Sequence, residues 1–326
     1  MSVPGKRVQN GTYDFDDYMR VADTRTRWKV ICDGIYNPAK GTYLDKTPKQ
    51  WGVTGLFYLI FFSVLAVFFA ICMKGLMASL PTERPRWTLD SSLIGTTPGL
   101  GFRPISENTA ERSLIWYSAS NATQVEIWAN RLDKFLEQYK NSSLLPNGGR
   151  NQQICSSAQP LKEGNACAVD VNNWGPCSPE ERYGYNNSSP CIFIKLNRIF
   201  DWVPDYYNDP QNLHKDMPEE LVNYIKNTNS SWLNTVWVSC KGENPHDKEA
   251  IGELEYYPKY HGFPGYYYPY RNTPGYLSPV VAVRFLRPAR NRIINVECRA
   301  WAKNVQYSSV KSEKKGATHF ELMVDD

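Results

Sequence analysis

Hydrophobic residues are concentrated in one long run near the N-terminus. The stretch from Val53 to Met73 is 21 residues long, carries no charge and lies between Lys49 and Lys74. As a helix with a rise of 1.5 Å per residue it is about 31 Å long, close to the roughly 30 Å hydrocarbon core of a bilayer. The pattern therefore predicts a single membrane-spanning helix rather than a buried core helix.

After this run comes a segment rich in proline and glycine, and then segments with helical patterns. Residues 81–104 contain four prolines and three glycines, which predicts an extended stalk. An amphipathic helix is expected next, because apolar residues recur there at helical spacing. A shorter helix is expected to begin at residues 217–220, Met-Pro-Glu-Glu, with proline and acids in its first turn. The apolar positions of the first of these helices are Val125, Trp128, Leu132, Phe135, Leu136 and Tyr139.

Strand-like alternation dominates the rest of the chain. In the clearest case, Ile294, Val296, Cys298 and Ala300 face one way and the polar residues between them face the other. Period-two alternation with long connections rich in Pro, Gly and Tyr predicts a mainly-β, partly antiparallel sandwich with one or two helices. Four further strands are expected within residues 191–200, 235–240, 279–286 and 318–326.

The cysteines place this sandwich in an oxidising compartment. Eight are present: Cys32 precedes the apolar run, Cys72 lies inside it and six follow it. An even set on one side of a membrane predicts three disulfides, and the sequence alone allows fifteen pairings. A zinc site is disfavoured, because no Cys-x-x-Cys occurs and the four histidines are scattered. The six cysteines are Cys155, Cys167, Cys177, Cys191, Cys240 and Cys298.

Glycosylation motifs lie on the same side of the run as these cysteines. Asn186 and Asn187 belong to overlapping motifs, so we expect only one of the two to carry a glycan. Asn10 also matches the motif but precedes the run, where it is expected to stay bare. The five candidate sites are Asn121, Asn141, Asn186, Asn187 and Asn229.

Charge and position together predict the topology. Residues 1–52 carry nine Lys or Arg and six Asp, a net charge of +3, which mildly favours a cytosolic N-terminus and fits anionic lipid. The run begins too late and is too long for a cleaved signal peptide, so it is expected to be an uncleaved signal anchor of a single-span type II protein. The expected segments are a cytosolic tail at 1–52, a transmembrane helix at 53–77, a stalk at 78–104 and an ectodomain at 105–326.

Catalytic motifs are scarce. Asp45-Lys46-Thr47 matches the first three letters of the phosphorylation motif of P-type ion pumps, but Pro48 stands in place of glycine. About 50 residues before the span leave no room for the nucleotide-binding domain that such an aspartate needs. No Walker loop, Gly-x-Ser-x-Gly or dinucleotide-binding glycine pattern occurs. The sequence therefore predicts no enzyme activity, no catalytic or metal-binding residue, no cofactor and no nucleic-acid partner.

Several long motifs resemble one known family. The sequence is similar to the beta subunits of the sodium/potassium- and proton/potassium-transporting ATPases from about Trp28 to the C-terminus. It departs from them at Arg271, where a tyrosine is usual, and at residues 45–48, where the family usually has Gly-Arg-Thr-Gly. The segments that carry the likeness are YGYNNSSPCIFIKLNRI (183–199), YYYPY (266–270), GYLSPVVAVRF (275–285) and VECRAWAKNVQYS (296–308).

The resemblance implies an architecture and a function. It implies an immunoglobulin-like ectodomain with long insertions and sequential disulfides, Cys155–Cys167, Cys177–Cys191 and Cys240–Cys298. It implies a non-catalytic plasma-membrane subunit that supports folding, assembly and delivery of the catalytic alpha subunit and modulates extracellular K⁺ binding. The implied partners are that alpha subunit, the lipid bilayer and a small single-span regulatory subunit.

The contact residues are expected in three places. Tyr58 and Phe62 in the span are expected to touch the alpha subunit, the alternative being that they face lipid. The other candidates are the stalk residues Arg86 and Trp87 and the aromatic segment Tyr266, Tyr267, Tyr268 and Tyr270, for which a packed corner of the sandwich is the alternative. For the whole chain, the alternatives are a cell-adhesion glycoprotein and the beta subunit of a proton/potassium pump.

Overall fold

The computed structural model describes residues 26–38, 41–44, 46–159, 161–171, 174–307 and 315–326. The chain divides into two compact units, one ending at Leu80 and the other beginning at Pro81, and each is described by itself. Asp45, Asn10 and residues 1–25 of the expected cytosolic tail lie outside the described residues.

The first unit contains the expected long apolar helix. α2 spans Pro48–Ser79 and, within the described residues, is the one helix long and apolar enough to cross a membrane. It begins before the expected segment because Thr47 and Gln50 form a capping box, in which each side chain binds the backbone N–H of the other residue. Pro48 occupies the first helical position, where its missing N–H costs nothing. Thr47 and Pro48, the last two of the four residues compared with the pump motif, are thus the cap and the first residue of a helix.

Three small elements precede α2. Helix α1 spans Arg27–Ile35 and is followed by strands β1, Tyr36–Asn37, and β2, Thr42–Tyr43. The two strands pair in antiparallel fashion, with Tyr36 opposite Tyr43. Before α2, the described residues thus form a helix followed by a hairpin.

The second unit is built on two sheets. One has the strand order β10-β8-β12-β13-β4 and the other β3-β7-β11-β9. All neighbours in both sheets are antiparallel except β13 and β4, which run parallel. The strands of the first sheet are β4 (Leu114–Ser118), β8 (Thr235–Gly242), β10 (Gly262–Pro264), β12 (Ile294–Trp301) and β13 (Ala317–Asp325). Those of the second are β3 (Leu100–Arg103), β7 (Cys191–Leu196), β9 (Leu254–Tyr257) and β11 (Val280–Phe285).

The two sheets enclose one hydrophobic core. Phe320 of β13 contacts Phe102 of β3 and Phe285 of β11, with ring centroids 5.0 and 6.2 Å apart. On β12, the side predicted to be apolar is buried, as at Ile294 and Val296. The five strands predicted from alternation are all present, so the mainly-β ectodomain is confirmed.

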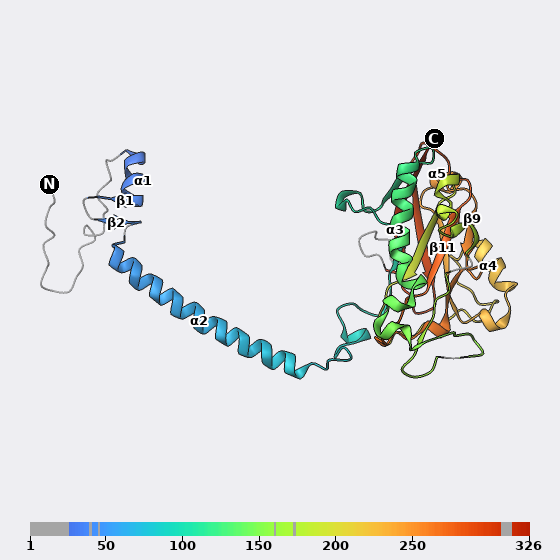
Figure 1. The fold of residues 1–326 in the computed structure, drawn as a ribbon, viewed down its shortest axis with the longest axis horizontal. Coiled ribbons are helices and arrows are strands. Elements are labelled where there is room, and N and C mark those ends of the chain that lie inside the picture. The colour runs from blue at the N-terminus through green and yellow to red at the C-terminus, as the bar shows by residue number, and fades with distance from the viewer. Residues whose placement is uncertain (1–25, 39–40, 45, 160, 172–173, 308–314) are drawn as a thin grey trace, which may run out of the picture. The chain divides into compact units, whose positions relative to one another are not determined.

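Helix α3, Ala122–Lys140, covers the outer side of the second sheet (Figure 1). Its residue Phe135 and the loop residues Trp174 and Tyr183 all pack against Phe193 of β7. Phe193 is therefore fully buried, although it alternates with Ile192 and Ile194 and falls on the same side of the strand as Lys195. The sequence of β7 is almost continuously apolar because both faces of the strand are covered.

Two further helices lie near the first sheet. α4, Glu219–Lys226, begins where its sequence predicted and packs Leu221 and Ile225 beside Trp237 and Trp301. α5, Pro245–Ala250, was not predicted and exceeds the expected one or two helices. Its signal was present in the sequence as Asn-Pro-x-Asp, in which Asn244 and Asp247 form a capping box.

Three disulfides join the six cysteines that follow α2. The pairs are Cys155–Cys167, Cys177–Cys191 and Cys240–Cys298, those that the family resemblance implies. Cys240 and Cys298 are direct partners on the neighbouring strands β8 and β12. This bond therefore lies within one sheet and does not cross the core. Short strands β5, Gln152–Gln153, and β6, Ala166–Cys167, pair beside the first disulfide.

Candidate partner-binding surfaces

Tyr58 and Phe62 form an aromatic stripe on α2 that the rest of the chain does not bury. Every residue of α2 is described and none is buried. Tyr58 and Phe62 are 49% and 57% exposed, and their rings stack with centroids 5.9 Å apart. A neighbouring stripe contains Gly55 and Ser63, and nothing lies within 4 Å of the Cβ position of Gly55. Membrane helices associate through such combinations of bulky and small residues, so this side of α2 is suited to a second helix.

The stalk presents a second aromatic site. The guanidinium of Arg86 lies 5.6 Å from the ring centroid of Trp87, and the Trp87 side chain is 54% exposed. The following turn is a short 3₁₀ helix, Leu89–Ser91, which is closed by hydrogen bonds between Thr88 and Ser91. The indole is thus available to a partner.

The four candidate tyrosines of the segment 266–270 do not point the same way. Tyr267 is only 5% exposed, and its hydroxyl donates to the carbonyl of Ala168 at 3.1 Å. Tyr268 meets Trp202 edge to face at 5.6 Å. Burial raises the pKa of both tyrosines well above the usual value. These two rings belong to the packed interior of the segment.

Tyr266 and Tyr270 are half-buried, as Tyr268 is, so part of each ring is accessible. Tyr270 packs against Tyr276 and lies beneath Arg198, and its hydroxyl donates to Asn272 at 2.9 Å. Arg271, where the family usually has tyrosine, forms an exposed ion pair with Asp201 at 2.8 Å. The departure from the family at this position therefore replaces a ring by a surface charge.

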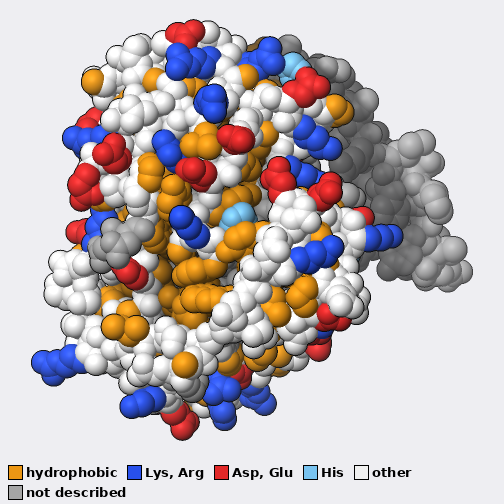
Figure 2. Space-filling model, turned by 90° about the vertical axis from the view of Figure 1, so that its right-hand side faces the viewer, with side chains coloured by type: hydrophobic (Ala, Val, Ile, Leu, Met, Phe, Trp, Pro, Cys, Tyr) orange, Lys and Arg blue, Asp and Glu red, His pale blue; other side chains and the backbone are white. Residues whose placement is uncertain are grey.

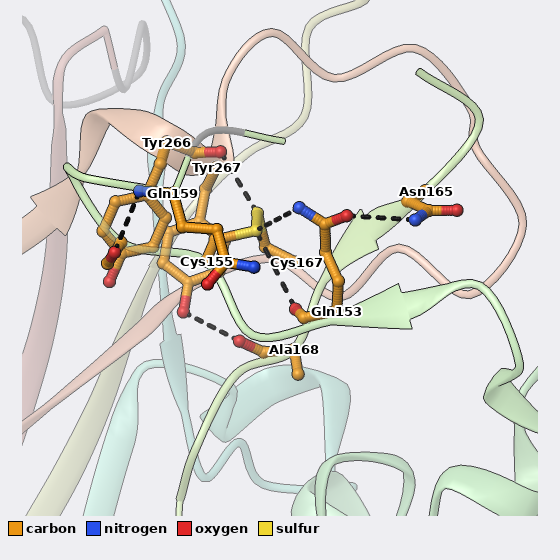
Figure 3. Close-up of a disulfide and its surroundings, with 9 residues drawn as sticks. Gln153, Cys155, Gln159, Asn165, Cys167, Ala168, Tyr266 and Tyr267 are labelled. Carbon is orange, nitrogen blue, oxygen red and sulfur yellow. Dashed lines mark hydrogen bonds between the residues drawn. A yellow bond between two sulfur atoms is a disulfide. The ribbon is translucent and has the colours of Figure 1, made fainter. Parts of the chain in front are cut away.

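The loop that is closed by the Cys155–Cys167 disulfide lies against this segment. Figure 3 shows Sγ of Cys167 beside the backbone carbonyl of Tyr266, at 3.3 Å, while Tyr267 reaches Ala168 in the same loop. Gln153 and Asn165 join the two sides of that loop through their side-chain amides at 3.0 Å. A cavity of about 420 Å³ lies between the loop and the tyrosines. Loop closure by the disulfide therefore helps to position the aromatic segment.

The five glycosylation candidates are all exposed. Asn121 caps α3 through Oδ1, which accepts from the backbone N–H groups of Thr123 and Gln124. Asn141 and Asn229 cap short 3₁₀ helices in the same way. An N-linked glycan is attached to Nδ2, so the caps leave the reactive atom free. The exposed Asn186 and Asn187 lie at the end of the 3₁₀ segment Arg182–Asn187.

A groove with a buried histidine was not predicted. Figure 2 shows hydrophobic side chains gathered in a hollow on one face of the molecule. Near α4 and β9, a groove of about 260 Å³ contains His261 between the rings of Tyr224 and Tyr256, with centroids 4.2 and 4.3 Å away. Burial lowers the pKa of His261 to about 4. Glu255 and Lys259 are the charged residues that line the same groove.

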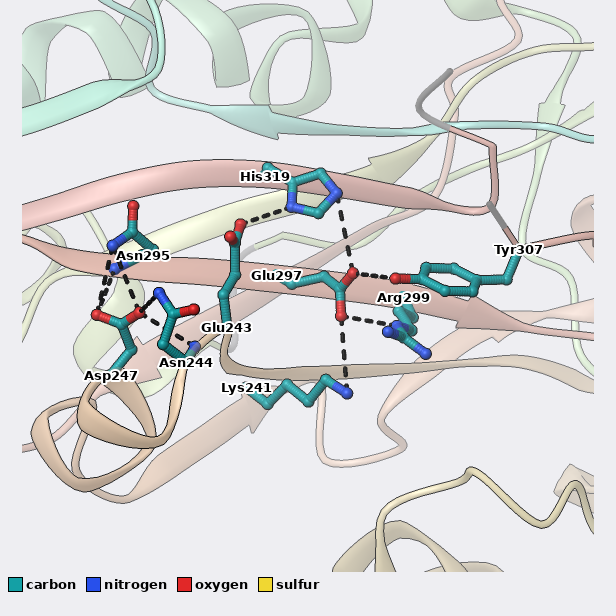
Figure 4. Close-up of polar contacts among 9 residues, drawn as sticks. All are labelled: Lys241, Glu243, Asn244, Asp247, Asn295, Glu297, Arg299, Tyr307 and His319. Atoms are coloured by element: carbon teal, nitrogen blue, oxygen red, sulfur yellow. Dashed lines mark hydrogen bonds and ion pairs between the residues drawn. The ribbon is translucent and has the colours of Figure 1, made fainter. Parts of the chain in front are cut away.

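A buried carboxylate on the outer side of the first sheet was also missed. Glu297 accepts hydrogen bonds from Tyr307 at 2.6 Å and Arg299 at 2.7 Å, and Lys241 lies 3.7 Å away (Figure 4). Burial would raise the pKa of Glu297, but these hydrogen bonds and cations outweigh it and lower the pKa. His319 lies 3.8 Å from Glu297. The carboxylate is thus saturated with donors, which suits a structural cluster and not general-base chemistry.

A second buried carboxylate in Figure 4 has the same character. Asp247 of α5 accepts from the backbone N–H groups of Asn244 and Asn295 and from their side-chain amides. These bonds outweigh the effect of burial and lower the pKa of Asp247. Within the described residues, no group of three or more His, Cys, Asp or Glu side chains is arranged to hold a metal ion.

Comparisons with known proteins agree on one family. The family model described as "Sodium / potassium ATPase beta chain" matches residues 21–320. The chain is 45% identical to "Sodium/potassium-transporting ATPase subunit beta-2" of Drosophila melanogaster over 95% of this chain and 97% of that protein. It is 43% identical to the beta-1 subunit of the same organism over 91% and 93%. It is 30% identical to the "Probable sodium/potassium-transporting ATPase subunit beta-3" of Caenorhabditis briggsae over 90% and 86%.

Proposed function

The chain belongs to the sodium/potassium ATPase beta chain family, and from this premise we propose that it is the accessory partner of a catalytic alpha subunit. The observation that carries the proposal is the match over residues 21–320, which includes the span and all strands of both sheets except the end of β13. All three relatives named above carry a sodium/potassium name. We therefore propose the sodium/potassium pump as the partner, ahead of a proton/potassium pump.

We propose a type II topology in the plasma membrane. Residues 1–52 lie in the cytosol, 53–77 cross the bilayer, 78–104 form the stalk, whose end is strand β3 of the second sheet, and 105–326 form an immunoglobulin-like ectodomain outside the cell. Three disulfides and five exposed glycosylation motifs on the C-terminal side of α2 support this orientation. The two-sheet arrangement around one core supports the assignment of the ectodomain.

The proposed role of the chain is to bind the alpha subunit without catalysing a reaction itself. A subunit that binds only the folded form of its partner stabilises it, so the unassembled alpha subunit is expected to be retained and degraded. Contacts that differ between the states of the pump bias its cycle, and extracellular K⁺ binding is the step proposed here. The saturated hydrogen bonding of Glu297 and Asp247 is consistent with a chain that has no catalytic residues of its own.

The proposed contacts are those that the chain leaves accessible. In the span they are Tyr58 and Phe62, and in the stalk Arg86 and Trp87. In the ectodomain they are Tyr266 and Tyr270, while Tyr267 and Tyr268 are assigned to holding the segment in place. A small single-span regulatory subunit is a further proposed partner, alongside the bilayer itself.

Co-purification in mild detergent tests the proposal. The full-length tagged chain is expected to bring down one large polypeptide with the phosphorylation motif of a P-type ATPase. The proposal fails if the glycosylated chain reaches the cell surface in quantity with no such polypeptide bound. Aggregation of cells through homotypic contacts in the absence of any pump subunit would instead favour the adhesion alternative.

A further inference from the structure

Helix α1 carries an exposed apolar stripe. Trp28, Ile31, Cys32 and Ile35 recur at helical spacing and fall within about 100° of the helix circumference. Three of these residues are 74%, 52% and 58% exposed, in chain order, and Cys32 is exposed as well. Large apolar residues are rarely exposed together on a nine-residue helix unless something covers them.

The hairpin that follows α1 extends this apolar surface. The rings of Tyr36 and Tyr43 contact each other with centroids 4.8 Å apart. The backbone N–H of Leu44 donates to the carbonyl of Ile35 at 3.0 Å, which ties the far strand of the hairpin to the end of α1. Leu44 is itself exposed. The helix and the hairpin thus form one small folded element.

This element is attached directly to the start of the span. The indole N–H of Trp51, in the first turn of α2, donates to the carbonyl of Tyr43 at 2.8 Å. The ammonium of Lys46 lies 5.4 Å from the Trp51 ring centroid. Trp51 precedes Val53, the start of the uncharged run, by two residues, or about 3 Å of helix. The hairpin therefore lies at the boundary where α2 enters the hydrocarbon.

We propose that the α1 stripe, Trp28, Ile31, Cys32 and Ile35, lies in the headgroup region of the adjacent leaflet and binds anionic lipid. Continuity with the span places the element at the interface, which is the depth that Trp and Tyr prefer. The cations Lys46 and Lys49, at the start of α2, are exposed and complement negatively charged headgroups. The inference rests on the proposed membrane crossing of α2.

The bound stripe gives the membrane helix a fixed depth and rotation. A free single helix can rotate about its axis and slide along the bilayer normal. The Trp51–Tyr43 hydrogen bond couples α2 to an element that lies flat on the lipid surface, so both freedoms are reduced. The stripe that contains Tyr58 and Phe62 then keeps one orientation before any partner helix binds.

Native Cys32 provides the probe for a depth measurement. The full-length chain with Cys72→Ser is spin-labelled at Cys32 in nanodiscs that contain phosphatidylcholine with or without phosphatidylserine. Collision with lipid-soluble oxygen is compared with collision with a water-soluble nickel chelate. Two matched labels, Lys29→Cys and Ser63→Cys, are placed in a background with Cys32→Ser and Cys72→Ser, on the polar side of α1 and in the middle of the span.

The expected result is a gradient of depth. The ratio of oxygen to nickel collision at Cys32 should exceed that at Lys29→Cys at least threefold, rise further with phosphatidylserine, and stay below that at Ser63→Cys. Replacing Ile31 and Ile35 by Gln, which preserves helix propensity, should bring the Cys32 ratio down to that of Lys29→Cys. Lys29→Gln is the control and should leave oxygen contact at Cys32 dominant.

Three outcomes overturn the proposal. Equal nickel access at Cys32 and Lys29→Cys, with Ser63→Cys still protected, shows that the stripe is in water although α2 crosses the bilayer. Nickel access at Ser63→Cys refutes the membrane crossing and with it the proposed function. Protection of Cys32 that appears only when the alpha subunit is co-purified assigns the stripe to a protein surface and not to lipid.

Discussion

The rings of Tyr58 and Phe62 stack on each other one helical turn apart on α2, with their centroids separated by 5.9 Å. The pair forms a preformed aromatic surface on a helix in which no residue is buried by the rest of the chain. Because apolar side chains gain little by leaving lipid, such a surface contributes to assembly only through close packing with another helix. Mutation of this pair therefore distinguishes a span that contacts the alpha subunit through Tyr58 and Phe62 from one in which these residues face lipid.

Replacing Tyr58 and Phe62 by Leu should weaken retention of the alpha subunit. Loss of close packing is expected to cost about 1 kcal/mol, or about fivefold in the amount co-purified from mild detergent. Phe57→Leu with Phe68→Leu is the matched control, because these two aromatic residues are equally exposed on other sides of α2. If both double variants retain the partner equally, the aromatic pair faces lipid.

The inward and outward tyrosines of the ectodomain should respond differently to mutation. Tyr266→Ala with Tyr270→Ala is expected to reduce partner binding by about 2 kcal/mol, about thirtyfold, while thermal unfolding changes little. Tyr267→Ala removes a buried ring and its hydrogen bond to Ala168, so it should destabilise the ectodomain by about 3 to 5 kcal/mol. Calorimetry and co-purification on the same samples check both effects. A large stability loss in the first variant would assign Tyr266 and Tyr270 to packing as well.

Acidification should destabilise the ectodomain through His261. Its pKa is about 4 in the folded chain against 6.5 for the free side chain, because burial between Tyr224 and Tyr256 disfavours the charged form. Between these two values the unfolded chain binds more protons, so stability is complete above about pH 6.5 and declines as the pH falls toward 4. The shift corresponds to at most about 3 kcal/mol. The free energy of unfolding of His261→Gln, measured by chemical denaturation at several pH values, should depend less on pH in this window. An unchanged slope would assign the pH dependence to other groups.

Asn121 combines a helix cap with a glycosylation motif, and the two functions can be separated. Asn121→Asp keeps the acceptor oxygen for Thr123 and Gln124 but loses the attachment site, whereas Asn121→Gln loses both. Glycosidase treatment should show one glycan fewer in both variants. Only the Gln variant should lose the cap, at about 1 kcal/mol of unfolding free energy. A mobility shift identical to that of the unmutated chain would mean that Asn121 carries no glycan.

Local sequence predicted only part of the elements, and it missed α1, α5 and strands such as β3, β4 and β9. The apolar run predicted α2, the spacing from Val125 to Tyr139 predicted α3, and alternation predicted five of the strands. These signals are local because a helix or strand shows its own period of burial. The family resemblance, and not spacing, supplied the pairing of the six cysteines, since spacing alone allowed fifteen arrangements.

The sequence did not predict the burial of side chains that are covered by residues outside their own local pattern. Glu297 lies on the polar side of β12 by alternation, yet it is buried because Arg299, Tyr307 and Lys241 converge on it. Phe193 falls on the same side of β7 as Lys195, yet it is covered by α3 and by a loop. For His261 no local pattern indicates that Tyr224 and Tyr256 enclose the ring.

By itself, the sequence determined the long apolar helix, α3, α4 and five of the strands, and it showed that the six paired cysteines and the five glycosylation motifs follow α2. Only the tertiary structure decided that Tyr267 is the buried one of the four tyrosines, which carboxylates are buried, and that the Trp51 indole ties the α1 hairpin to the start of α2. The physical reason is that propensity and periodicity act within one element. Burial, hydrogen-bond pairing and pKa depend instead on residues far apart in the chain that only the fold brings together.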